Sequence, residues 1–245
     1  MTFPTDPLVV LIHGAGHDRR IWWAVTLGLS RLGWQVSAPD LPGHGADERA
    51  PCPTIEEYAA ALAAGLDAER PVVAVGHSMG SLVALELAAR LGERCRGLAL
   101  IGTALPMAVS PELLERAAEP RAACQMMEPW AFGARARGTG LPRAVQELVL
   151  EQRPGVLAND LRACHAYAAE PALERAKGMT APALFLTGAQ DRMTPVKAAT
   201  RLWETLARRE AACTWHTLPG VGHTPMLEAP LALRWLLHRF LRRCR

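Results

Sequence analysis

Short runs of apolar residues alternate along the chain with longer segments in which apolar positions recur every three or four residues. The short runs have the length of strands and contain few polar positions, which is typical of strands that are buried on both faces of a parallel sheet. We therefore expect six strands, at residues 8–12, 34–38, 71–75, 97–101, 183–187 and 213–217.

The segments between most of these strands have helical spacing. Thr54 and Glu57 have the spacing of a capping box at a helix start, and Pro195 stands in the first turn of another helix. Strands separated by helices favour a parallel sheet with helices on both faces, so the predicted fold class is α/β. The expected helices lie at about residues 19–32, 54–69, 79–91, 195–208 and 231–242.

This alternation stops between residues 105 and 180, where helical patterns continue but no run predicts a strand. We expect residues 1–104 and 181–245 to form one core, with residues 105–180 inserted as a helical cap. Apolar cap side chains are candidates to close a pocket and exclude water, although packing of the cap onto the core accounts for most of them. These side chains are Met107, Leu113, Leu114, Met126, Met127, Trp130 and Phe132.

The composition is that of a folded globular protein, with 50% hydrophobic and 21% charged residues in 245. Lysine and arginine number 27 and aspartate and glutamate 24, so the net charge is only +3. That excess is too small to argue for a nucleic-acid partner. No run of apolar residues is long enough for a membrane span, so none is expected.

The N-terminal segment Met1–Pro7 has neither the positive charge nor the apolar stretch of a secretory signal. No two cysteines form a C-x-x-C motif, and none stands at zinc-ligand spacing from histidines, so we expect no metal site. Isolated thiols fit a reducing cytosol, and a cytoplasmic location is expected. The cysteines are Cys52, Cys95, Cys124, Cys164, Cys213 and Cys244.

A G-x-S-x-G motif, residues 76–80, follows the third predicted strand and precedes a helix. In this context the motif predicts a nucleophile elbow, a tight turn that holds the hydroxyl of Ser78 above the sheet. Glycines are needed because side chains at positions 76 and 80 would collide with neighbouring backbone. The alternative is an ordinary glycine-rich turn, but the chain has only five serines, which makes a chance match rare.

A serine nucleophile needs a histidine base and a carboxylate that orients the base. Asp191 follows the fifth predicted strand and His223 the sixth, both in glycine-rich loops and in the order expected after such an elbow. For each residue the alternative is structural, a helix-terminal acid or a buried histidine. The loop after the first strand predicts a backbone donor at Ala15, which with the amide of Met79 would form an oxyanion hole.

With these motifs the chain resembles the serine hydrolases of the α/β-hydrolase fold superfamily over nearly its whole length. Further matches are P-D-L-P-G-H-G at residues 39–45 and G-H-T-P at residues 222–225. The resemblance implies an α/β-hydrolase fold with a six-stranded, mainly parallel sheet. It also implies roles for five residues: Ser78 as nucleophile, His223 as base, Asp191 as acid, and Ala15 and Met79 as oxyanion donors. Structural roles are implied for His13, Asp40, His44, His77 and Glu228.

The opening segment, residues 13–22, is similar to the short methylesterase and hydroxynitrile-lyase branch. The lyases carry lysine after the catalytic histidine, where Thr224 stands here, and they replace the glycine retained at Gly14. The expected function is therefore hydrolysis of small or medium carboxylic esters through an acyl-enzyme, without metal or cofactor. A thioesterase, a C–C bond hydrolase or lyase, and a non-catalytic binding protein remain alternatives, and the oligomeric state stays open.

Overall fold

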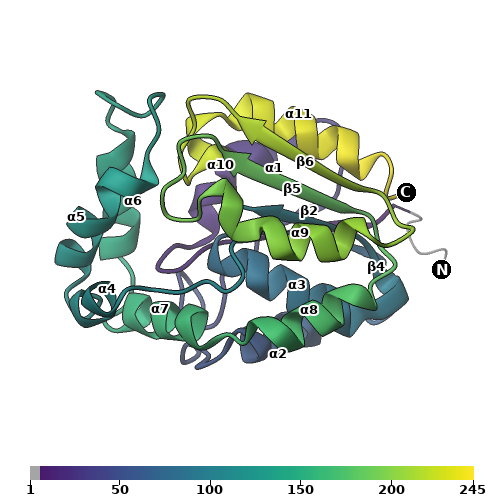
Figure 1. The fold of residues 1–245 in the computed structure, drawn as a ribbon, viewed down its shortest axis with the longest axis horizontal. Helices are drawn as coiled ribbons and strands as arrows, with labels where there is room; N and C mark the ends of the chain where they lie inside the picture. The colour runs from purple at the N-terminus through teal and green to yellow at the C-terminus, as the bar shows by residue number, and fades with distance from the viewer. Residues whose placement is uncertain (1–5) are drawn as a thin grey trace.

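The computed structural model describes residues 6–245 as a six-stranded sheet flanked by helices (Figure 1). The strand order is β2-β1-β3-β4-β5-β6, and every neighbouring pair is parallel. The N-terminal prediction about a secretory signal falls largely on residues 1–5, outside the described residues. The strands are β1 (Leu8–Ile12), β2 (Val36–Ser37), β3 (Val72–His77), β4 (Cys95–Ile101), β5 (Ala183–Gly188) and β6 (Cys213–Leu218).

All six predicted strands are present, and β2 differs most from its prediction, because only Val36 and Ser37 of the expected residues 34–38 form the strand. The backbone N–H of Trp34 donates instead to Leu29 at the end of the preceding helix, at 3.2 Å. Trp34 therefore still belongs to the turn after that helix, and the strand at the edge of the sheet begins only at Val36.

Alternate side chains of the central strands enter two separate cores, as the pleat of a strand requires. On one face, Val73 and Val75 pack with α1 (Trp23–Ser30) and α11 (Pro230–Leu241). On the other face, Val72 and Ala74 pack with residues of five helices. β3 is buried along its full length, so packing on both faces of the sheet holds Ser78, the residue that follows the strand. The five helices are α2 (Ile55–Ala64), α3 (Met79–Leu91), α7 (Val156–Ala166), α8 (Ala169–Lys177) and α9 (Thr200–Ala207).

The predicted helices are present with shifted ends. The first begins as a 3-10 turn, Arg19–Trp22, before α1, and α9 is preceded in the same way by Val196–Ala199. Thr54 caps α2 by accepting the N–H of Glu57 at 3.2 Å, and the helix ends before Gly65, a residue of poor helix propensity. No helix among residues 6–245 is both long enough and apolar enough to cross a membrane.

Residues 105–180 contain five helices and, as predicted, no strand. Figure 1 shows α4, α5 and α6 beyond the carboxyl ends of the strands, while α8 runs beside the core. Buried residues of α4 to α7 form an apolar cluster of their own, whereas α8 packs with α3 and α9. The predicted boundaries of the cap stay a prediction. The remaining helices are α4 (Pro111–Arg116), α5 (Pro120–Ala131), α6 (Leu141–Leu150) and α10 (Pro225–Glu228).

Candidate active site

Ser78 connects the end of β3 to the start of α3 and has a strained backbone. Its φ of 54° makes it the one non-glycine residue with positive φ among residues 6–245, and such a conformation persists only where the surroundings impose it. The backbone N–H of Ser78 donates to the carbonyl of Ile101 on β4 at 2.9 Å. The neighbouring strand thus holds the turn in place.

The glycines around Ser78 are required by close contacts. A Cβ at Gly76 would overlap the carbonyl oxygen of Gly80, and one at Gly80 would overlap the carbonyl oxygens of Ile12 and His13. The elbow is therefore pressed against the loop that follows β1. A Cβ on Gly14, in that loop, would lie 3.1 Å from the Cβ of Ser78, so the loop backbone runs directly beside the serine.

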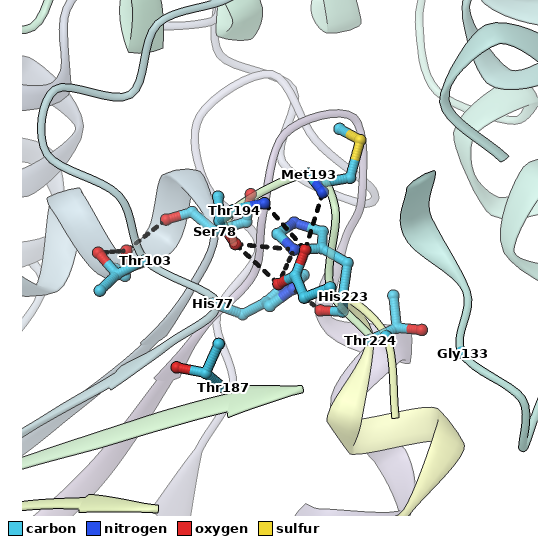
Figure 2. Close-up of polar contacts among 12 residues, drawn as sticks. His77, Ser78, Thr103, Gly133, Thr187, Met193, Thr194, His223 and Thr224 are labelled. Atoms are coloured by element: carbon cyan, nitrogen blue, oxygen red, sulfur yellow. Dashed lines mark hydrogen bonds and ion pairs between the residues drawn. The ribbon is translucent and has the colours of Figure 1, made fainter. Parts of the chain in front are cut away.

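Asp191 and His223, which follow β5 and β6, are joined by a hydrogen bond of 2.9 Å between Oδ2 and Nδ1. The Asp191 carboxylate also accepts the backbone N–H groups of Met193 and Thr194, at 2.9 and 2.8 Å, and the Thr194 hydroxyl at 2.8 Å (Figure 2). Both oxygens are thus occupied, and the side chain is fully buried. The carboxylate can only receive hydrogen bonds here, which orients the ring of His223.

Because Nδ1 of His223 is bound to Asp191, Nε2 is the ring nitrogen that stays free, and His223 lines one cavity with Ser78. His77, the last residue of β3, supports the loop of His223. Its Nε2 donates to the backbone carbonyl of His223 at 2.7 Å, and the two rings lie 4.7 Å apart. Burial holds the pKa of His77 well below its usual range. His77 is therefore neutral, donates a structural hydrogen bond, and does not compete with His223 as a base.

The carboxylate of Glu228 organises the loop that carries His223. One oxygen accepts the backbone N–H groups of Gly222 and Gly133 at 2.9 Å each, and the other accepts the backbone N–H and hydroxyl of Thr224 at 3.1 Å each. Gly133 belongs to the segment that follows α5, so this single buried side chain ties the histidine loop to the inserted helices. Its contacts agree with the structural role that the family resemblance implies.

The last residues of α5 also contact the loops of Asp191 and His223 through their backbone. The carbonyl of Ala131 accepts the N–H of His223 at 2.6 Å, and the carbonyl of Trp130 accepts the N–H of Arg192, next to Asp191, at 3.0 Å. Movement of the end of α5 would therefore disturb the loops of Asp191 and His223 together.

The two predicted oxyanion donors flank Ser78. Met79 is buried and is the first residue of α3, directly after the serine, and Ala15 lines the same cavity as Ser78. The backbone N–H of the next residue, Gly16, donates to Asp160 on α7 at 2.9 Å. The inserted helices thus position the loop on this side too, while the roles of the two amides stay predictions.

Residues 9–234 match the model of the alpha/beta hydrolase family. The chain belongs to this family. A bifunctional biotin biosynthesis protein, BioHC, from Cellvibrio japonicus is 29% identical over 94% of this chain. A pimeloyl-[acyl-carrier protein] methyl ester esterase from Neisseria meningitidis is 28% identical over 95% of the chain and 76% of its own length.

The chain spans 46% of the length of BioHC, and its matches to two further curated relatives span 40% and 44% of their lengths. Among solved structures, a thermophilic esterase has a TM-score of 0.81 and 27% identity, over 96% of this chain and 90% of its own. An esterase from Thermogutta terrifontis has a TM-score of 0.83 and 25% identity, over 98% and 91%. The comparisons establish the α/β-hydrolase fold over nearly all of the chain.

The cavity of this α/β hydrolase has a volume of about 90 Å³. Met127 and Phe132 line it, as predicted for two of the seven apolar cap residues, whereas Leu113 packs in the cluster of the inserted helices and Met107 in the core. The apolar lining is therefore supplied mainly by residues that the sequence pattern did not single out. They are Cys124, Val145, Val149, Leu157 and Leu161.

His17 also lines the cavity, and the sequence pattern gave it no role. Neither of its ring nitrogens has a hydrogen-bond partner within residues 6–245. Burial, followed by the proximity of His223, lowers the pKa of His17 to about 4, so the ring is neutral near pH 7. A neutral imidazole offers one donor and one acceptor, so His17 offers unpaired polar atoms to a cavity wall that is mostly apolar and also contains Glu128 and Gln146.

Asp160 on α7 is another residue to which the sequence pattern assigns no role. It is completely buried and accepts hydrogen bonds from His44 Nε2 at 2.7 Å and from the Tyr58 hydroxyl at 2.7 Å, in addition to Gly16. Burial alone would lower the pKa of His44, but the hydrogen bond to Asp160 and its charge raise the pKa above the usual value. His44 Nδ1 lies 3.0 Å from the carbonyl of Pro42, so both ring nitrogens act as donors.

We expect Asp160→Asn to lower the free energy of unfolding by about 3 kcal/mol, because it removes the buried carboxylate that accepts hydrogen bonds from Gly16, His44 and Tyr58. The measurement is urea unfolding followed by circular dichroism at pH 6. The exposed Asp67 provides the matched control, since Asp67→Asn should change stability by less than about 0.5 kcal/mol. Equal urea midpoints for the two variants would contradict the role given to the buried pair.

Proposed function

We propose that the chain hydrolyses carboxylic esters through an acyl-enzyme on Ser78. The observation that carries this proposal is the strained serine, φ 54°, in one cavity with a histidine whose Nδ1 is bound to a buried aspartate. A structural turn has no need of such strain beside an oriented base. The esterases among the relatives support the same reaction class.

In the first half of the proposed reaction, Nε2 of His223 accepts the proton of Ser78 as the serine Oγ attacks the ester carbonyl carbon. Negative charge develops on the carbonyl oxygen, where the amides of Ala15 and Met79 would stabilise it. The tetrahedral intermediate then collapses, the bond to the alcohol oxygen breaks, and His223 donates its proton to the departing alcohol. Asp191 stays ionised and stabilises the imidazolium.

In the second half, His223 removes a proton from water as the water oxygen attacks the acyl carbon. Collapse of this intermediate releases the carboxylic acid and returns the proton to Ser78. The chain's own side chains and amides supply every proton transfer and charge contact that this cycle needs.

The cavity favours small substrates. A volume of about 90 Å³ is well below the several hundred Å³ typical of sites for drug-sized ligands. Its apolar wall suits a short acyl or alcohol group, and His17 can bind a polar atom of the substrate. We propose that residues 105–180 act as a cap over residues 1–104 and 181–245, which agrees with the contacts of Trp130, Ala131 and Gly133 to the triad loops.

We also propose a cytoplasmic location and a small-molecule ester as the substrate. All six cysteines are unpaired, and burial raises the pKa of those at positions 95 and 124 to about 11. Such thiols are unreactive and fit a reducing compartment.

Replacing Ser78 by alanine removes the attacking oxygen, so we expect Ser78→Ala to lower kcat for p-nitrophenyl acetate by at least about 10⁴-fold. The assay is release of p-nitrophenolate under saturating substrate. Ser30→Ala, at an exposed serine far from the cavity, should keep the kcat of the parent protein. Turnover by Ser78→Ala near the parent value, in protein with an unchanged circular dichroism spectrum, would assign the nucleophile elsewhere.

A series of p-nitrophenyl esters from acetate to decanoate measures how much acyl chain the cavity accepts. We expect kcat/KM to be highest for acetate to butyrate and to fall by at least about tenfold at decanoate, since an acyl chain that does not fit loses its transition-state contacts. A value that rises steadily to decanoate would show that the cavity opens to long chains and would refute the assignment to small substrates.

A further inference from the structure

Positive charge is concentrated at one part of this molecule, away from the cavity. Residues 19–37 and 229–245, which include α1 and α11, contain eight arginines and no aspartate or glutamate. The whole chain has a net charge of only +3, so the remainder carries a net charge of −5. The even charge balance of the sequence therefore conceals two regions of opposite sign.

Large apolar side chains are exposed in the same place. Among residues 6–245, six large apolar residues are exposed, and five of them lie on α1, on α11 or in the turn after α1. Trp23 and Leu27 of α1 are 65% and 45% exposed, and Leu231 and Trp235 of α11 are 68% and 54% exposed. Exposed tryptophans that gather on one surface mark an interaction site more often than a solvated surface.

The two helices pack directly against each other (Figure 1). A Cβ on Gly28 of α1 would overlap the side chain of Arg234 on α11, and Trp34 Nε1 donates to His238 Nδ1 at 2.9 Å. On each helix the exposed apolar residues are spaced by four positions, which places them on one side of that helix. Two apolar stripes therefore run along neighbouring helices.

Most of the arginines on these helices have no carboxylate partner. Arg19, Arg20 and Arg245 form ion pairs, but the others form none with residues 6–245. Arg239 lies over the ring of Trp235 at 4.7 Å, so charge and aromatic surface are adjacent. The unpaired arginines are Arg31, Arg234, Arg239, Arg242 and Arg243.

We propose that this surface, which we call the α1–α11 face, docks on an anionic lipid bilayer. Tryptophan and arginine with leucine are the side chains that bind the boundary between headgroups and acyl chains. A second copy of the chain is disfavoured because it would bring two unpaired arginine clusters together, and nucleic acid would leave the apolar stripes exposed. The α1–α11 face consists of Trp23, Leu27, Arg31, Leu231, Arg234, Trp235, Arg239, Arg242 and Arg243.

Docking through this face leaves the cavity accessible. The cavity lies between the carboxyl ends of the strands and the inserted helices, whereas α1 and α11 cover one face of the sheet. The protein would therefore be held at the membrane surface without blocking its site. This inference is independent of the reaction proposed above, because it uses none of the cavity residues.

Co-sedimentation of the full chain with lipid vesicles tests the proposal. We expect binding at low salt to vesicles of phosphatidylcholine mixed with phosphatidylglycerol, little binding to phosphatidylcholine alone, and weakening by added salt. The triple change Arg239→Gln, Arg242→Gln and Arg243→Gln should weaken binding by at least about tenfold. The double change Trp23→Ser and Trp235→Ser should weaken it as well and remove a blue shift of tryptophan fluorescence.

A matched control removes the same charge elsewhere, at Arg116, Arg162 and Arg208, which are exposed and form no ion pair among the described residues. This triple glutamine variant should bind anionic vesicles like the parent. Circular dichroism checks the folding of every variant independently of activity.

Three results would overturn the proposal. The first is absence of binding to the anionic vesicles at low salt. The second is binding that the tryptophan changes leave intact, which indicates attraction by charge alone, as for nucleic acid. The third is a dimer in light scattering that the tryptophan changes dissociate, which would make the α1–α11 face a contact between copies.

Discussion

The conformation of Ser78 is the constraint on which the rest of the site depends. A φ of 54° is costly for a residue with a side chain, and here it is imposed by a strand buried on both faces, by a hydrogen bond from the serine N–H to β4, and by two glycines without room for a Cβ. Because the elbow is pressed against the loop after β1, the same contacts bring the amide-bearing loop to the serine. One packing arrangement thus places the candidate nucleophile and one side of its oxyanion site.

Three buried carboxylates fix the remaining loops around that elbow. Asp191 orients His223, Glu228 holds the backbone on both sides of His223, and Asp160 holds the loop of Ala15 through Gly16. Asp160 comes from the inserted helices, and Glu228 binds the segment that follows α5. Residues between β4 and β5 therefore contact the loops on both sides of the elbow.

The sequence showed the elbow and the pairing of Asp191 with His223, but it did not show the polar contacts that Asp160 makes from α7. The strands were predictable because burial on both faces leaves continuous apolar runs, and the elbow was predictable because steric exclusion at positions 76 and 80 demands glycine. Asp160 had no such signal: it stands among ordinary helical residues, and its partner His44 is 116 positions away. The packing of α8 beside α3 was hidden for the same reason, since a helical pattern does not say which surface it meets.

Covalent labelling of the active site decides whether Ser78 is the nucleophile of a working esterase. The full chain would be treated with a fluorophosphonate probe, digested, and examined by mass spectrometry for the modified peptide. We expect stoichiometric modification at Ser78 that Ser78→Ala abolishes and prior heat unfolding prevents. A folded protein that remains unlabelled, or that is labelled at another serine, would contradict it.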